Sequence, residues 1–118
     1  MANTFKVVTN DAMPASAGTP LALYTVPGST TTIVLGLILA NVHSASVTAS
    51  VQLTSSTAGS NPNTNANVWL CKDVSIPVGS SLEVLSGSKV VLQTTDDILI
   101  DCSVTGKIDA ALSIMEQT

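Results

Sequence analysis

The longest apolar run in the chain, Thr32 to Val42, constrains the fold more than any other feature. Its central part, Ile33 to Ala40, carries no polar side chain. The run is too short to cross a bilayer as a helix, which takes roughly 20 apolar residues. A buried helix is the main competitor, but the β-branched residues, the preceding threonines and Gly36 favour a strand.

A strand that is apolar on both faces has to be covered on both sides. The two faces would carry Leu35, Leu37 and Leu39 on one side, and Val34, Gly36, Ile38 and Ala40 on the other. A second sheet, a loop layer or a neighbouring subunit could cover the second face. The low charge of the chain favours a subunit.

The composition points in the same direction. The 118 residues are enough for one domain that buries about two-thirds of the surface of its unfolded chain. Only 10% of the residues are charged and 3% are aromatic, whereas a typical soluble domain carries about 25% charged residues. Serine and threonine take the place of charges. Such a surface suits a protein covered by identical neighbours or by a larger assembly, and a secreted-type β-domain is the alternative.

The charge argues against two classes of partner. The net charge is −4, with four lysines and no arginine, and the lysines are scattered along the chain. A nucleic-acid backbone requires clustered cations, and anionic lipid requires a polybasic patch. The first residues also lack a basic start followed by an apolar segment, as a signal peptide would have. We therefore expect no nucleic-acid or membrane partner, and a protein that stays in a cytoplasm or enters a particle assembled there.

Cys71 and Cys102 are the two cysteines, too few for a disulfide scaffold and without the CxxC spacing of metal or redox sites. Each lies in a strand-like segment, so the sequence predicts buried free thiols. A disulfide between neighbouring strands is the alternative, formed late in oxidising surroundings.

Short strands separated by turn residues run along the whole chain, with turn signals about every eight to twelve residues and no helical period. Residues 1–19 are predicted to hold a strand at Phe5–Thr9 and then a loop or extended arm. Residues 20–118 are predicted to form the β-sandwich domain. Its expected strands are Leu21–Val26, Thr32–Val42, Ser46–Thr54, Val68–Ile76, Ser81–Leu85, Lys89–Gln93, Ile98–Cys102 and Lys107–Glu116. The fold class is therefore all-β: a single antiparallel β-sandwich or jelly-roll-like domain of about eight strands.

The strand at Ser46–Thr54 has the cleanest alternation. Val47, Ala49, Val51 and Leu53 would face the core, and the residues between them would face solvent. A short connection joins this strand to the apolar run, which predicts that the two pair as a hairpin. The polar segment Ser55–Asn67 that follows is predicted to be a long exposed loop and a candidate contact surface.

The sequence offers little for catalysis or metal binding, and we predict no enzyme, no cofactor and no catalytic, cofactor-binding or metal-binding residue. His43 is the only histidine, so it cannot join a histidine cluster for zinc, and the sequence does not place the nucleophile and the orienting acid that a catalytic triad would need. Asp96, Asp97 and Asp101 could suggest a Ca²⁺ site, but their spacing matches no EF-hand loop. Aspartates at turns and strand starts are ordinary.

Two aromatic side chains could serve recognition. Trp69 and Tyr24 could form a sugar-stacking platform in a receptor-binding domain, although aromatics distant in sequence are more often packing anchors.

Two stretches together resemble a known family. The first is Tyr24-Thr25-Val26-Pro27-Gly28 followed by TTTIVLGLILANVHSASVTASVQL. The second is Ile76-Pro77-Val78-Gly79-Ser80-Ser81-Leu82, continuing to Leu92 and then Asp96-Asp97-Ile98. They resemble small β-sandwich virion structural proteins of tailed bacteriophages, over roughly residues 20 to 116. This family contributes no catalytic residues.

The resemblance implies a structural role in a virion assembled in a bacterial cytoplasm. Its first version is a capsid decoration (cement) protein, a homotrimer that binds the phage major capsid protein and bridges capsomers on the outer capsid surface. Many copies of one weak contact would add up through multivalency. A neck, tail or baseplate component is the alternative, with another virion protein as its partner. A host-receptor or carbohydrate-binding module is a second alternative.

Overall fold

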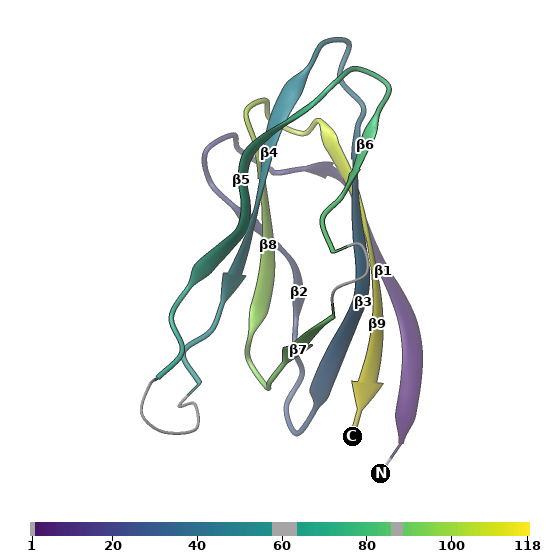
Figure 1. Ribbon diagram of the computed structural model, residues 1–118, viewed down its shortest axis with the longest axis vertical. Helices are drawn as coiled ribbons and strands as arrows, with labels where there is room; N and C mark the ends of the chain where they lie inside the picture. Colours follow the sequence, from purple (N-terminus) through teal and green to yellow (C-terminus); the bar gives the residue numbers. More distant parts are fainter. Residues whose placement is uncertain (1, 58–63, 86–88) are drawn as a thin grey trace.

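Strands wind back and forth between two facing antiparallel sheets in this computed structural model, which describes residues 2–57, 64–85 and 89–118 (Figure 1). The predicted all-β sandwich is confirmed. Within these residues there is no helix long and apolar enough to cross a membrane.

In the described part of the chain, the first sheet, called sheet A below, contains five strands and the second, called sheet C, contains four. Sheet A is built from β1 (Asn3–Met13), β3 (Thr31–Asn41), β6 (Ser81–Glu83), β7 (Val90–Leu92) and β9 (Ile108–Gln117). Sheet C is built from β2 (Leu21–Thr25), β4 (Val47–Thr54), β5 (Val68–Ile76) and β8 (Asp97–Cys102).

The strand order decides between the two architectures that the sequence leaves open. Sheet A runs β1-β9-β3-β6, with β7 also paired to β3, and sheet C runs β2-β8-β4-β5. Successive strands mostly change sheets, so that late strands lie beside early ones. This double-sheet winding is the arrangement of a jelly roll.

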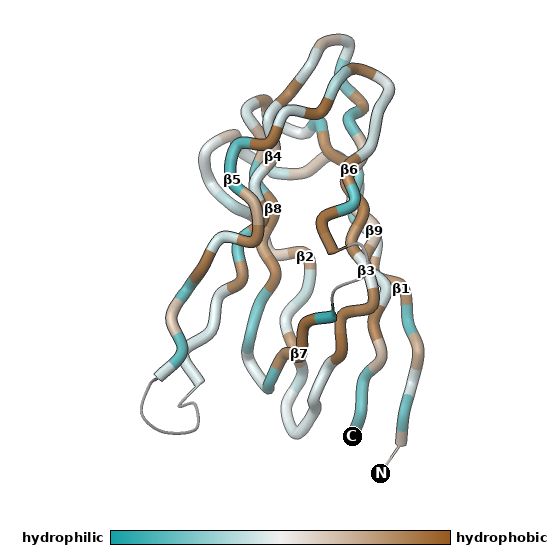
Figure 2. Tube along the Cα trace, in the orientation of Figure 1, coloured by the Kyte–Doolittle hydropathy of each residue, from teal (hydrophilic) through white to brown (hydrophobic). Residues whose placement is uncertain are grey.

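The apolar run forms β3, which pairs with β9, β6 and β7 in the middle of sheet A. Figure 2 shows hydrophobic residues along most of this strand. One face of β3 packs into the sandwich, where Val34, Leu37 and Leu39 are at most 1% exposed. The second sheet therefore covers one face of the run, and the other face is open.

The predicted composition of the open face is partly wrong. The pairing of β3 with β9 shifts register between Val34 and Gly36, which marks a β-bulge. Because of this extra residue, Val34 faces the core, whereas Leu35 points outward and is 38% exposed. Ile38 and Ala40 lie on the outer face, as predicted.

The predicted hairpin between the apolar run and Ser46–Thr54 is also wrong. β3 belongs to sheet A and β4 to sheet C, where β4 pairs with β5 and β8. The buried amide of Asn41 holds the crossover, because its Nδ2 donates to the carbonyls of Ala45 (3.0 Å) and Ile76 (2.9 Å). The two strands thus approach the same core from opposite sides.

The alternation within the strands is confirmed where each strand has one buried face. On β4, Val47, Ala49 and Val51 are buried, and Leu53 is half-buried against the core. On β8 and β9 the buried apolar residues are Ile98, Ile100, Cys102, Ile108, Ala110, Leu112 and Ile114. The jelly roll encloses these side chains as one hydrophobic core.

The N-terminal segment is more integrated than the sequence indicates. The predicted strand Phe5–Thr9 is part of a longer β1, which pairs with β9 from Asn3 to Asn10 in unbroken register. Residues 14–19 pack on the chain's own β8–β9 connection instead of forming a free arm. There Gly106 N donates to the Pro14 carbonyl (2.9 Å) and Ala17 N to Thr105 Oγ1 (2.9 Å).

The two ends of the described chain lie together at one end of the sandwich (Figure 1). Ala2 and Thr118 exchange two backbone hydrogen bonds, of 3.0 and 2.9 Å. This pair extends the β1–β9 ladder and fixes which backbone groups of β1 face β9.

Candidate functional site

The outer face of sheet A carries a row of apolar side chains that crosses four strands. The strand register places Phe5 of β1 beside Met115 of β9, Met115 beside Ile33 of β3, and Ile33 beside Val91 of β7. Phe5 is 71% exposed and Val91 60% exposed, whereas Met115 and Ile33 are half-buried. Four strands spaced about 4.8 Å apart make this row roughly 14 Å wide. We call it the apolar row.

Further apolar side chains extend this face along the strands. Val7 follows Phe5 on β1 and is 67% exposed, and Leu35 and Ile38 on β3 are 38% and 43% exposed. Scattered apolar residues are normal on a protein surface, but a contiguous group of large ones marks a site of interaction with another protein. The outer face of sheet A is therefore the candidate functional surface.

Two shallow hollows lie on this face, one on each side of Ile38. A hollow of about 540 Å³ lies between β1, β9 and β3 and is lined by Thr9, Asn10, Asp11, Ile38, Ala40, Asp109, Ala110 and Ala111. A smaller one of about 290 Å³ lies by the bulge and is lined by Leu35, Gly36, Leu37, Ile38, Glu83, Leu85, Ala111 and Ser113. Small side chains such as Ala111 leave this space. The charged residues among these described linings are all acidic: Asp11, Asp109 and Glu83.

A network of polar side chains joins the two sheets near the chain ends. The Tyr24 hydroxyl donates to Glu116 Oε2 at 2.6 Å and lies 2.8 Å from Thr32 Oγ1. The ammonium group of Lys6 lies 2.6 Å from Glu116 Oε1. Glu116 is only 6% exposed, so these contacts replace the water that its carboxylate loses on folding.

The network shifts the pKa of both acids. The bonds to Lys6 and Tyr24 hold the pKa of Glu116 below its ordinary value and outweigh the opposing effect of burial. The pKa of Tyr24 is raised to about 12, mainly by burial and to a lesser extent by the hydrogen bond to Glu116. The network is therefore a structural clamp with Glu116 ionised and Tyr24 neutral.

Trp69 and Tyr24 do not together form the sugar-stacking platform that the sequence allowed as a hypothesis. Tyr24 lies on β2 and Trp69 on β5, which are the two opposite edges of sheet C. The Tyr24 hydroxyl is directed into the clamp described above, whereas Trp69 is 42% exposed on the outer side.

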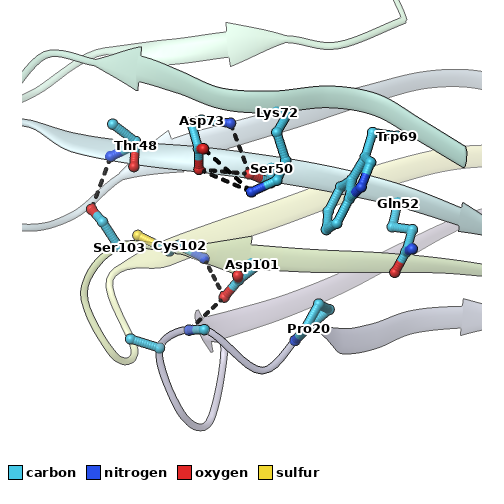
Figure 3. A pocket seen from close by; sticks show the side chains of 12 residues that line it. Pro20, Thr48, Ser50, Gln52, Trp69, Lys72, Asp73, Asp101, Cys102 and Ser103 are labelled. Atoms are coloured by element: carbon cyan, nitrogen blue, oxygen red, sulfur yellow. Dashed lines mark hydrogen bonds and ion pairs between the residues drawn. The ribbon is translucent and has the colours of Figure 1, made fainter.

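Trp69 borders a polar groove of about 680 Å³ on the outer face of sheet C (Figure 3). The Lys72 ammonium lies 4.9 Å from the centre of the indole ring, a cation–π distance. Several polar groups of the groove are bonded within the chain. Asp73 N donates to Ser50 Oγ (2.8 Å), and Asp101 Oδ1 accepts from Gly18 N (3.0 Å).

His43 lies in the connection between β3 and β4, as a loop residue just after a strand end, which was the predicted position. Its backbone N–H donates to Asn41 Oδ1 at 2.8 Å, and this bond is part of the crossover. The three aspartates considered as Ca²⁺ ligands do not come together at one site. Asp96 and Asp97 lie at the start of β8 and Asp101 near its end.

Asp96 has a structural role that the sequence did not reveal. Its carboxylate is 3% exposed and accepts bonds from Ser55 Oγ (2.7 Å), Thr57 Oγ1 (3.1 Å) and Gln93 N (3.0 Å). These bonds tie the β7–β8 turn to the beginning of the predicted contact loop, Ser55–Asn67. The central residues of that loop, 58–63, lie outside the described residues.

Both cysteines carry free thiols, as predicted, but only Cys102 is buried, whereas Cys71 is half-buried. Cys71 lies on β5 and Cys102 on β8, with β4 between them. Strands two positions apart are roughly 9.6 Å from each other, beyond the Cα separation of about 7 Å that a disulfide tolerates. Burial raises the pKa of the Cys71 thiol.

Comparison with known proteins supports the fold and leaves the family open. No protein-family model matches the chain, and no curated protein does. Among solved structures, the fold is similar to that of a protein of Bacillus endospore appendages, described as a novel family of disulfide-linked pili. The TM-score is 0.50 at 13% sequence identity, over 99% of this chain and 87% of that chain. The likeness shows a shared all-β fold.

Sequence reasoning found β3 as a source of the exposed face and missed the other strands that complete it. Phe5 and Val7 alternate with Lys6 and Val8, and Met115 alternates with Ile114 and Glu116. These alternations predict strands, but they do not reveal that β1, β9, β3 and β7 are neighbours. The apolar row exists only once the strand order is known.

Proposed function

We propose that the chain is a structural subunit of a multi-copy particle, with no catalytic role. In its specific form, it is a capsid decoration (cement) protein of a tailed-phage virion, and the outer face of sheet A docks on the particle. The observation that carries this proposal is the apolar row with its extension along β1 and β3. Phe5 and Val7, at 71% and 67% exposure, are unusual for a free surface.

The charges around the apolar row indicate the chemistry of the partner. Asp11, Asp109 and Glu83 line the hollows on this face. Two copies placed face to face would bring these carboxylates together, which opposes that arrangement. A complementary surface would be apolar at its centre and would carry lysine or arginine at its rim. We infer that the partner on this face is a different protein, such as the major capsid protein.

The fold and the composition support a structural role more broadly. The similar solved structure belongs to a pilus, which is also an assembly of protein subunits. Only 10% of the residues are charged, which suits a surface that is covered in the mature particle. A neck, tail or baseplate component would use the same surface. The oligomer on the particle is expected to have several copies, and the trimer implied by the phage resemblance stays a prediction.

Copy number tests this proposal. Particles purified from cells that produce the chain would be analysed by quantitative mass spectrometry against the major capsid protein. A decoration protein is expected at a copy number comparable to that of the capsid protein. A few copies per particle would support the neck, tail or baseplate role instead. Absence of the chain from all purified particles would contradict both.

A second candidate function, carbohydrate binding, rests on the groove beside Trp69. An exposed indole with polar neighbours such as Gln52 and Asp101 is a common way to bind a sugar ring. A glycan array with the wild-type protein and Trp69→Ala tests it. Glycan binding that Trp69→Ala abolishes would support this candidate, and no binding above background would reject it.

A further inference from the structure

β1 leaves one complete edge of sheet A without a partner strand among the described residues, because the sheet order begins at β1. Ala2 and Thr118 exchange two backbone hydrogen bonds, so the residues in register with this pair, Thr4, Lys6 and Val8, also bond to β9. The alternate residues, Phe5, Val7 and Thr9, therefore direct their N–H and C=O groups away from β9, toward the open edge. An extended strand could pair with these groups.

The other edges of the two sheets are protected against such pairing. β6 and β7 have three residues each, and the five-residue β2 is flanked by Pro20 and Pro27. β5 is longer, but its register shifts twice and it carries the charged pair Lys72–Asp73. Short length, proline, irregular register and charge are the usual devices that prevent edge-to-edge association.

β1 has none of these devices along its regular part. It keeps unbroken register with β9 from Asn3 to Asn10. Its one lysine, Lys6, reaches toward Glu116 at 2.6 Å and so is occupied within the chain. The residues whose backbone faces the open edge include Phe5 and Val7, which are also the most exposed large apolar side chains among the described residues.

We infer that β1 pairs antiparallel with β1 of a second copy of this chain, around a twofold axis at Val7. In the described residues, β1 is the only long and regular edge, so its best complement is another β1. A twofold axis at Lys6 would place two lysines opposite each other, which is unfavourable. The axis at Val7 avoids this and sets Phe5 of one copy opposite Thr9 of the other.

The resulting contact has definite properties. Three hydrogen-bonded pairs around Val7 would exchange about six backbone hydrogen bonds, two for each pair. The two outer faces of sheet A would join into one continuous sheet, in which the two apolar rows are offset by four residues along β1. This self-pairing does not depend on what the merged face binds, so it stands or fails separately from the proposed function. It predicts a twofold dimer, in contrast to the trimer implied by the phage resemblance.

Substitutions at Val7 and at a matched control position test the inference. The Val7 N–H does not serve β9, so Val7→Pro removes an edge donor without breaking the ladder inside the chain. Val7→Lys places two cations on the twofold axis. Val91→Lys is the control, because Val91 has a similar exposure on the same face of sheet A but lies on β7. Circular dichroism establishes that each variant is folded.

Light scattering at micromolar concentration gives the masses. The wild type and Val91→Lys are expected at about twice the 12.0 kDa of one chain, and the two Val7 variants at half that mass.

Val7→Cys provides a second measurement, because it detects the dimer by a covalent link and not by the loss of association. Directly opposed residues in a hydrogen-bonded pair have Cα atoms about 5.5 Å apart, within disulfide range. Mild oxidation is thus expected to link Val7→Cys, but not Val91→Cys, into a covalent dimer. A wild-type monomer or trimer, Val7→Pro and Val7→Lys variants that remain dimeric, or no link in Val7→Cys would overturn the inference.

Discussion

The hydroxyl of Tyr24 donates a 2.6 Å hydrogen bond to Oε2 of Glu116 and so joins β2 of sheet C to β9 of sheet A. Lys6 of β1 completes this contact from the edge of the sheet. One buried carboxylate therefore connects both sheets and the N-terminal strand. Stability at low and at high pH should report on this clamp.

Ionisation of Tyr24 tests the clamp from the alkaline side. Tyr24 is the single tyrosine, so ultraviolet absorbance of tyrosinate reports on it alone. Its pKa should be about 12 in the folded protein and near 10.0 in denaturant. Because the folded pKa is the higher one, this contribution to stability is complete below pH 10.0 and falls as the pH rises toward 12. Tyr24→Phe should lower the free energy of unfolding at neutral pH by about 1.5–3 kcal/mol. The stability of this variant should no longer decline between pH 10.0 and 12 for this reason. A tyrosine that titrates near 10.0 in the folded protein would contradict the clamp.

Substitution of Glu116 tests the clamp from the acidic side. The folded pKa of Glu116 lies below its ordinary 4.5, so its contribution is present above pH 4.5 and is lost as the pH falls through the folded value. We expect Glu116→Gln to be less stable at neutral pH by about 1–3 kcal/mol and to lose part of the acid dependence in urea unfolding. Glu83→Gln is the matched control, since Glu83 is exposed, and should behave like the wild type. Equal acid dependence in all three proteins would argue against the clamp.

Leu37 and Ile38 are adjacent on β3 but lie on opposite faces of the strand, Leu37 on the core face and Ile38 on the candidate docking face. Leu37 is 1% exposed, so Leu37→Asp buries an unpaired carboxylate at a cost of several kcal/mol, comparable to the total stability of a domain. Ile38 is 43% exposed on the outer face, so Ile38→Asp should fold and unfold cooperatively. Circular dichroism with thermal unfolding compares the two. A folded Leu37→Asp or an unfolded Ile38→Asp would show that the assigned faces are wrong.

Thiol chemistry checks the strand order of sheet C. Because β4 separates Cys71 from Cys102, both thiols should titrate in denaturant without reductant. In the folded protein, Cys102 should react slowly because it is 3% exposed, and Cys71 should react less readily than a free cysteine because its pKa is raised. An intact mass lower by two hydrogens would reveal a disulfide that this strand order does not allow.

Alternation along the sequence was sufficient to place the strands with one buried face. The buried apolar residues of β4, β8 and β9 follow a simple period of two, because each of these strands has one core face and one outer face. Ser50 of β4 is the exception among the polar residues, since it is buried on the outer face, where its hydroxyl bonds to Asp73. The same rule failed on β3, because the bulge between Val34 and Gly36 inserts one residue. The core-facing residues are therefore even-numbered before the bulge and odd-numbered after it. The isolated Gly36 is a local signal of this bulge, because glycine inside a strand often marks one, but it does not identify which residue is the extra one.

The pairing of strands was the part that local pattern could not predict. A short connection between β3 and β4 resembles a hairpin, but the bonds of Asn41 direct the chain into the opposite sheet. The apolar row likewise depends on which strands are neighbours, since Phe5 and Met115 are far apart in sequence. The second apolar face of β3 is exposed, with Leu35 38% and Ile38 43% accessible, so its coverage by another subunit stays a prediction.

Rebinding of the protein to particles stripped of it tests the docking surface most directly. The wild type and Ser75→Asp, which changes an exposed residue on the outer face of sheet C, should rebind and sediment with the particles. Ile38→Asp, on the outer face of sheet A, should be folded but remain in the supernatant. Rebinding of Ile38→Asp equal to that of the wild type would contradict the assignment of sheet A as the docking surface.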